Sequence, residues 1–336
     1  MTLIQLKYLL GVVDNGLNIT ATAERLYTSQ PGISKQLRQL EQELGIQIFS
    51  RKSKSLVGIT PAGATVVDYA RKILRDVENI KGVGKDLMAE QTGTLSIATT
   101  HTQARYVLPD MLSQFHEQYP KVNLELHQGT SEQIADLVAD NRVDFAIATE
   151  STKLFPDLNL LPCFSWDRIV LTKKDHKLAG SSGPLTLSAL AEHPLITYVF
   201  SSTHESSFLN AFSAQKLEPN VVFTARDADV IKTYVRMGMG VGVIAPMALQ
   251  CDDLKDLHAE SAENLFPTVT TWLGVPRDRA MRGYMLDFIS LFAPHWPRHL
   301  IEQAAVAESQ DVVDSLASEV TIPKHNGCTG ELSSAA

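Results

Sequence analysis

Hydrophobic residues recur at intervals of three and four in three short runs over the first sixty positions, as they do on helices with one buried face. The runs predict helices over Leu3–Asp14, Ile19–Tyr27 and Pro31–Leu44, because the turn-like stretches NGLN and TSQ separate them. After Gly45, the strand-like stretch IQIFSRKSKSLVGIT carries a basic turn in its middle. This segment therefore predicts three compact helices followed by a two-stranded wing.

A longer helix is predicted next, over residues 61–90. Thr60 can cap its N-terminus and Pro61 suits its first turn. Its apolar positions return every three or four residues: Val66, Tyr69, Ile73, Val77, Ile80, Val83 and Leu87. A long helix with one apolar stripe and no domain around it predicts pairing with the same helix of a second copy.

From Gly93 onward, strand-like and helical stretches alternate, as in TLSIATT followed by LPDMLSQFHEQY. This alternation predicts an α/β body built on a parallel, doubly wound sheet. Residues 301–336 show little periodicity, so we expect a poorly ordered tail there.

The third helix divides its residues between two faces. A buried stripe is predicted for Ile33, Leu37, Leu40 and Leu44. The opposite, basic face consists of Pro31, Lys35, Arg38 and Gln42. Such a face can be an ordinary solvated surface, or it can meet phosphates and base edges in a major groove.

Charge is distributed unevenly along the 336 residues, whose net charge is −8. Residues 1–60 hold seven Lys or Arg against four Asp or Glu, a net charge of +3 that leaves −11 for the remainder. A basic module ahead of a larger acidic body is typical of a protein in which one part meets phosphates and another has a different task.

Residues 21–63, ATAERLYTSQPGISKQLRQLEQELGIQIFSRKSKSLVGITPAG, resemble the winged helix-turn-helix of the LysR-type transcriptional regulators. The resemblance implies a DNA-binding domain over 1–60, a dimerising linker helix over 61–90, and double-stranded promoter DNA as a partner. It also implies that Ala23 packs the motif's first helix against the recognition helix. The residues expected at DNA are Thr28, Ser29, Gln30, Pro31, Ser34, Lys35, Arg38 and Arg51.

Within this family, the chain is similar to the CysB- and Cbl-like branch, through strings such as SIATTHTQARYVLP and DADVIKTYVRMGMGVGVIA. The similarity implies a two-lobed effector domain like a type II periplasmic binding protein, with lobe I at 91–164 and 268–300 and lobe II at 165–267. It implies a homodimer or homotetramer, contact with RNA polymerase, and control of sulfur-assimilation and cysteine-biosynthesis genes. A Cbl-like role in the use of sulfonates or sulfate esters is the alternative. A solute-binding protein or an enzyme on the same fold is disfavoured by the basic helices ahead of the body.

Polar side chains follow several predicted strands of the body, at the edge where open α/β sheets bind ligands. The expected effector-binding residues are Thr100, Thr102, Gln103, Thr149 and Thr203. A single threonine at such a corner usually caps a helix, but three converging corners favour a site with neutral donors for a small anion. The similarity implies a sulfate-like anion or acetylserine. For Arg226, pairing with a second carboxylate of the ligand and pairing with Asp227 or Asp229 both stay open.

Other chemistries lack a pattern in the sequence. The glycines at 238–243 follow a predicted helix and precede a strand, the reverse of a dinucleotide-binding loop. Without GxSxG, HxxxH or CxxC spacing, no catalytic residue, metal or cofactor is expected, and Cys163, Cys251 and Cys328 are expected to be reduced thiols. No long apolar run or secretory signal is present, so we expect a cytoplasmic protein without a membrane partner.

Overall fold

The structure, a computed structural model, describes residues 1–336 except 53–54, 88–91, 141, 150–151, 181–182, 200–205, 278–280 and 328–336. At 55, 75, 78–79, 81–87, 152 and 180 it describes the backbone alone. The chain divides into two compact units, Met1–Glu90 and Gln91–Ala336. None of the described helices is both long and apolar enough to cross a membrane.

The first unit starts with three helices whose ends lie close to the predicted ones. Thr2 forms a capping box with Gln5 at the first helix, and Gly45 ends the third in the left-handed conformation (φ 67°). The second helix ends two residues earlier than predicted, because Tyr27 has a positive φ of 50°. The elements are α1 (Leu3–Asp14), α2 (Ile19–Arg25), α3 (Gln30–Leu44), β1 (Phe49–Lys52), β2 (Ser55–Ile59) and α4 (Pro61–Leu87).

The core of this unit lies between α1, α2 and α3. Ile33, Leu37 and Leu40 of α3 are buried in it together with Ala23, as the sequence predicted. The prediction was wrong for Leu44, which is 38% exposed, because the last turn of α3 extends past the packed helices.

The first half of α4 belongs to this same core, so the prediction of a helix without a domain around it was wrong there. Val67 and Ala70 are buried with the α1 side chains, and Arg71 pairs with Asp14 at 2.5 Å. Another face of α4 remains open, since Tyr69 is 65% and Ile80 is 72% exposed. The helix therefore presents one face to its own unit and an apolar face to solvent.

Gly63 marks a close approach between α4 and the wing. A Cβ at this position would lie 2.1 Å from the Ile48 carbonyl oxygen, which already accepts from Thr60 N. We expect Gly63→Ala to lower the free energy of unfolding of the first unit by about 1–3 kcal/mol, because backbone must move to admit the methyl group. Chemical denaturation followed by circular dichroism measures the change. Ala64→Ser, at the exposed next position, serves as the control, and equal stabilities of the two variants would contradict the prediction.

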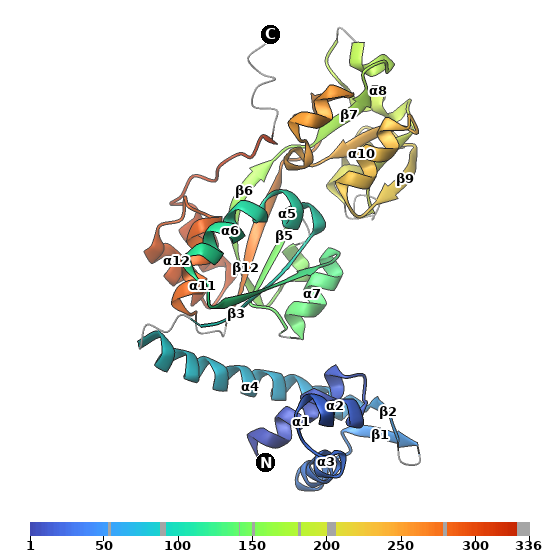
Figure 1. Cartoon of the computed structure of the whole chain (residues 1–336). Coiled ribbons are helices and arrows are strands. Elements are labelled where there is room, and N and C mark those ends of the chain that lie inside the picture. The colour runs from blue at the N-terminus through green and yellow to red at the C-terminus, as the bar shows by residue number, and fades with distance from the viewer. Residues whose placement is uncertain are drawn as a thin grey trace. The chain divides into compact units, whose positions relative to one another are not determined.

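The second unit contains two five-stranded sheets, and the first has the order β4-β3-β5-β12-β6. Its strands β3, β5, β12 and β6 are labelled in Figure 1. The predicted parallel pairing is present between β4, β3 and β5, but β12, which returns from the second sheet, runs antiparallel between β5 and β6. The strands are β3 (Gly93–Thr99), β4 (Val122–Gln128), β5 (Phe145–Thr149), β6 (Leu158–Trp166) and β12 (Val269–Pro276). Its helices are α5 (His101–Tyr106), α6 (Leu108–Gln118), α7 (Ser131–Ala139), α11 (Gly283–Phe292), α12 (Arg298–Ala305) and α13 (Gln310–Ala317).

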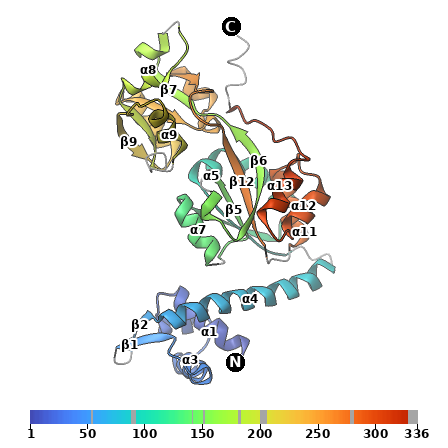
Figure 2. The same ribbon diagram turned by 180° about the vertical axis from the view of Figure 1, so that it is seen from behind.

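The second sheet has the order β11-β7-β10-β8-β9, and the chain reaches it from β6 and leaves it for β12 (Figure 2). We call the part built on the first sheet lobe I and the part built on the second lobe II. The strands are β7 (Ile169–Lys173), β8 (Leu195–Tyr198), β9 (Val221–Ala225), β10 (Val241–Ile244) and β11 (Leu257–Ser261). The helices are α8 (Leu187–Ala191), α9 (Ser207–Ala214) and α10 (Ala228–Arg236).

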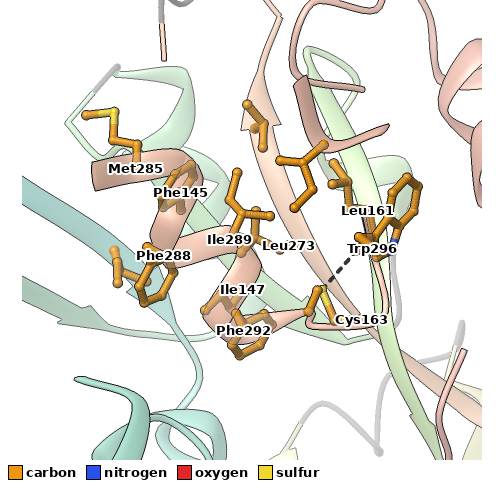
Figure 3. Packing of buried hydrophobic residues seen from close by; sticks show 14 of the residues in the cluster. Phe145, Ile147, Leu161, Cys163, Leu273, Met285, Phe288, Ile289, Phe292 and Trp296 are labelled. Carbon is orange, nitrogen blue, oxygen red and sulfur yellow. Dashed lines mark hydrogen bonds between the residues drawn. The ribbon is translucent and has the colours of Figure 1, made fainter. Parts of the chain in front are cut away.

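Lobe I has a dense aromatic core beneath α11 (Figure 3). Phe288 stacks on Phe145 of β5 with ring centroids 5.6 Å apart, and Phe292 packs beside it. Cys163 is buried here and free, but Cys251 is disulfide-bonded, so the prediction of three reduced thiols was wrong. Cys328 lies outside the described residues.

The predicted disorder of 301–336 was also wrong for residues 301–327. The short helices α12 and α13 bury Ile301, Ala304 and Val313 in the core of lobe I. The Asn159 amide donates to the Ala304 and Ala307 carbonyls at 2.9 and 2.8 Å, which fixes this segment to β6. The sequence did not reveal this packing, because each of the two helices has only eight residues, too few for a clear periodic pattern.

Candidate functional site

The predicted DNA-contacting residues of α3 lie together on the exposed side of its N-terminal half. Ser29, Gln30, Pro31, Lys35 and Arg38 are exposed, and Thr28 and Ser34 are partly so. Ser29 also caps the helix by accepting from Gly32 N at 3.3 Å. Lys35 and Arg38 form no hydrogen bond or ion pair with any described residue, so both cations are available to phosphates or bases.

Arg51 of the wing has a different environment. Its guanidinium pairs with the Glu41 carboxylate at 2.6 Å, and Glu41 also accepts from the Ile48 and Phe49 backbone N–H groups. Glu41 thereby ties α3 to β1. Arg51 thus helps to hold the wing against the recognition helix, whatever it contacts on DNA.

In the second unit, chain segments from both lobes meet at one pocket. The strands β3, β5 and β6 end at it from lobe I, and β8, β9 and β10 end at it from lobe II. Its volume, with the solvent at the open mouth included, is about 320 Å³. The lining residues are Thr100, Thr102, Gln103, Thr149, Trp166, Tyr198, Arg226 and Ala245.

Four of the five predicted effector-binding residues therefore line a single pocket. Thr102, Gln103 and Thr149 are each at least nine-tenths buried, and Thr100 is partly exposed at the start of α5. No side-chain hydrogen bond from Thr100 caps α5, so its hydroxyl is not committed to that role. Thr203 lies outside the described residues.

A buried hydrogen-bond chain positions the Gln103 amide. The Gln103 Nε2 and Trp166 Nε1 groups both donate to the Thr271 hydroxyl, at 3.3 and 3.1 Å. The Gln103 Oε1 atom is buried without a partner. If the amide rotates by 180°, Thr271 can donate to Oε1 and the NH₂ group turns to the free side. An anion in the pocket would favour the rotated orientation, because the Gln103 NH₂ group can then donate to the anion.

Sequence reasoning singled out Arg226 but missed Trp166 of β6 and Tyr198 of lobe II. Trp166 and Tyr198 are the last residues of buried strands, which was the available signal. Burial raises the pKa of the Tyr198 hydroxyl, so it stays protonated. The hydroxyl also accepts from Ala245 N at 3.3 Å.

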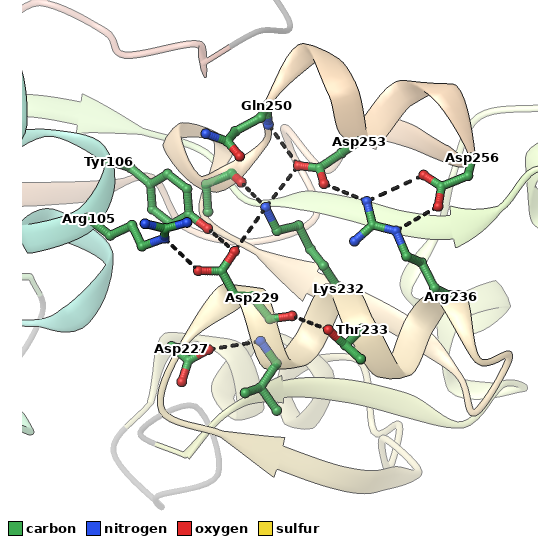
Figure 4. A network of polar contacts seen from close by, with 12 residues as sticks. Arg105, Tyr106, Asp227, Asp229, Lys232, Thr233, Arg236, Gln250, Asp253 and Asp256 are labelled. Carbon is green, nitrogen blue, oxygen red and sulfur yellow. Dashed lines mark hydrogen bonds and ion pairs between the residues drawn. The ribbon is translucent and has the colours of Figure 1, made fainter.

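A polar network joins the two lobes beside the pocket (Figure 4). The Asp229 carboxylate of α10 accepts from Arg105 Nε at 2.8 Å and from the Tyr106 hydroxyl at 2.7 Å, both on α5. Burial opposes ionisation of Asp229, but these hydrogen bonds and the Lys232 charge lower its pKa overall. Helix α5, which carries Thr102 and Gln103, is therefore held to helix α10, which begins two residues after Arg226.

One group of possible metal ligands also lies at this contact. Ligand atoms of His101, Asp227 and Asp229 fall within 4.8 Å of one another. Asp229 is already neutralised by Arg105 and Lys232, whose charges would oppose a bound cation. We therefore assign the cluster to the interlobe contact.

Comparison with known proteins agrees with this architecture. Residues 3–64 match the family described as Bacterial regulatory helix-turn-helix protein, lysR family, and residues 89–297 match the LysR substrate binding domain. These matches confirm the predicted resemblance, the winged helix-turn-helix and the two-lobed body.

Relatives of this chain are transcriptional regulators, which confirms the prediction that it is not an enzyme. The regulator CysB of Haemophilus influenzae is 43% identical over 94% of this chain and 97% of its own length. The regulator SsuR of Burkholderia cenocepacia is 42% identical over 87% of this chain and 94% of its own length. The crystal structure of the cofactor-binding domain of the Cbl regulator superposes with a TM-score of 0.60 at 38% identity, covering 65% of this chain and 95% of that domain.

Proposed function

Because the chain belongs to the LysR family of transcriptional regulators, we propose that it controls sulfur-assimilation and cysteine-biosynthesis genes in response to a small anion. The observation that carries this proposal is the interlobe pocket, in which strand ends from both lobes bring together neutral donors. Hydroxyl and amide groups of this kind bind an oxyanion without a buried countercharge.

The proposed mechanism uses the two lobes as a sensor. An effector that contacts both sides of the pocket binds the arrangement with the lobes together more tightly than any other, and so shifts the population toward it. Lys35 and Arg38 grip promoter DNA, with Thr28, Ser29, Gln30, Pro31 and Ser34 beside them and Arg51 at the wing. The open apolar face of α4 pairs with a second copy, and dimers assemble further into a homotetramer that contacts RNA polymerase.

Thr102→Ala tests the pocket as the effector site. Removing one donor hydroxyl should weaken sulfate binding by about 1 kcal/mol, or about fivefold, while DNA binding without effector stays unchanged. Isothermal titration calorimetry with sulfate measures the first and fluorescence anisotropy with a promoter duplex the second. Thr94→Ala, at the start of β3 and outside the pocket, is the matched control. An unaltered sulfate affinity of Thr102→Ala would remove the pocket from consideration.

A second candidate function is the control of sulfonate or sulfate-ester use, as expected for a Cbl-like regulator. The similarity to Cbl and SsuR, at 38% and 42% identity, is close to that with CysB, so this candidate stands beside the first. Ligand-dependent footprinting distinguishes the two, with promoters of cysteine-biosynthesis and sulfonate genes compared in the presence of acetylserine, sulfate, thiosulfate or adenosine phosphosulfate.

A further inference from the structure

Arg226 is the only charged side chain among the described residues that line the pocket. It lies directly after β9 and just before Asp227, the N-cap residue of α10. The other lining groups are neutral. The pocket can therefore distinguish ligands of different net charge only through this guanidinium or through charged groups around it.

The neighbouring carboxylates do not engage Arg226. Asp227 accepts from Val230 N at 2.8 Å, and Asp229 is paired with Arg105 and Lys232. Arg226 itself is exposed and forms no hydrogen bond or ion pair with any described residue. The sequence left open whether Arg226 pairs with Asp227 or Asp229 or instead with the ligand. In the structure, Arg226 pairs with neither carboxylate.

A free guanidinium at the mouth of such a pocket affects ligands of different charge differently. Its planar fork matches two oxygens of a sulfate or carboxylate group. It repels an ammonium group, which every amino-acid zwitterion carries. The carboxylates of Asp227 and Asp229 would repel an anion. The charge of Asp229 is offset by Arg105 and Lys232, and the charge of Asp227 has the Arg226 guanidinium as its neighbour in the chain.

We propose that Arg226 is the specificity-determining residue of the pocket and selects small doubly negative oxyanions over amino-acid zwitterions. This inference rests on the proposed function, because it takes the pocket as the effector site. Thr102, Gln103 and Thr149 hold one part of the oxyanion through neutral donors, and Arg226 closes on the oxygens that face lobe II.

The test measures binding of sulfate and of O-acetylserine to the full-length protein by isothermal titration calorimetry at one fixed ionic strength. Wild-type protein should bind sulfate more tightly than O-acetylserine. Arg226→Gln should lose about tenfold in sulfate affinity, as expected when one charge-assisted hydrogen bond is removed, with little change or a gain for O-acetylserine. Arg226→Lys should keep part of the sulfate preference, because it retains the charge but not the fork.

Arg142→Gln is the matched control, since Arg142 is also exposed in the second unit but does not line the pocket. Equal sulfate affinity of wild-type protein and Arg226→Gln would overturn the inference, as would equal losses for both ligands. If Thr102→Ala weakens sulfate binding and Arg226→Gln does not, only the role of Arg226 fails. If the wild-type protein binds neither ligand, the proposed effector site fails with it.

Discussion

Asp253→Asn is expected to lower the free energy of unfolding of the second unit by about 2–3 kcal/mol, because it removes the nearer of the two carboxylates that neutralise a buried ammonium group and leaves only Asp229, at 3.5 Å. The Lys232 side chain is 2% exposed, and its Nζ lies 2.9 Å from Asp253 and 3.0 Å from the Ala248 carbonyl (Figure 4). Asp253 also accepts from Arg236 at 2.6 Å. Urea denaturation followed by circular dichroism measures the loss.

Two comparisons isolate this effect from a general loss of charge. Asp252→Asn removes a carboxylate from an exposed pair with Lys255 and should change stability by less than about 0.5 kcal/mol. Replacing Lys232 by Met and Asp253 by Leu together should recover much of the loss, since no charge is then buried alone. If Asp253→Asn and Asp252→Asn proved equally stable, the buried pair would not have the assigned role.

At low pH, the difference in free energy of unfolding between the wild-type protein and Asp253→Asn should become smaller. Burial opposes the ionised form of Asp253, but hydrogen bonds from Lys232 and Gln250 lower its pKa overall. A carboxylate with a lowered folded pKa contributes stability that is complete above 3.8, its ordinary value, and is lost as the pH falls through the folded value. The asparagine variant lacks this contribution, so the two stabilities should converge at low pH.

Lys35→Ala and Arg38→Ala should each weaken operator binding by about 1–3 kcal/mol at fixed salt, if these side chains reach base edges. Both are exposed on the N-terminal half of α3 and have no partner among the described residues. Fluorescence anisotropy with a labelled promoter duplex measures the affinity, and repeating it at several salt concentrations separates base contacts from phosphate contacts.

Arg25→Ala provides the charge-matched control for this second prediction. Arg25 is exposed in the same unit, at the end of α2, and lies outside the predicted contact set. Its removal should have a smaller effect than that of Lys35 or Arg38. Equal losses for all three variants would indicate general attraction to DNA rather than a recognition face.

The parts of the fold that depend on neighbours in sequence were predictable. The limits of α1 and the start of α4 were predicted correctly, because Thr2, Thr60 and Pro61 mark helix starts by local hydrogen bonding and dihedral preference. The burial of the first half of α4 could not be predicted, since its buried residues, Val67 and Ala70, lie outside the apolar stripe seen in the sequence. Likewise, nothing local in β12 says that it inserts between β5 and β6.

The same division holds for the pocket. Thr100, Thr102 and Gln103 follow one strand directly, so their proximity could be predicted from a single corner of the sheet. Trp166, Tyr198 and Arg226 join them from strand ends that are far apart in sequence, and only the packing of two lobes brings them together. The role of Thr271 depends on its position beside Gln103 and Trp166, which no spacing in the sequence reveals.

The placement of β12 also bears on how the molecule is made. The sheet of lobe II has all its strands once Ser261 has been synthesised, whereas lobe I lacks an interior strand until Pro276 has followed. Domains tend to fold as units while the chain is still growing. On the ribosome, lobe II can therefore fold first, although it comes later in the sequence. Lobe I begins earlier but cannot complete its sheet until β12 has been synthesised.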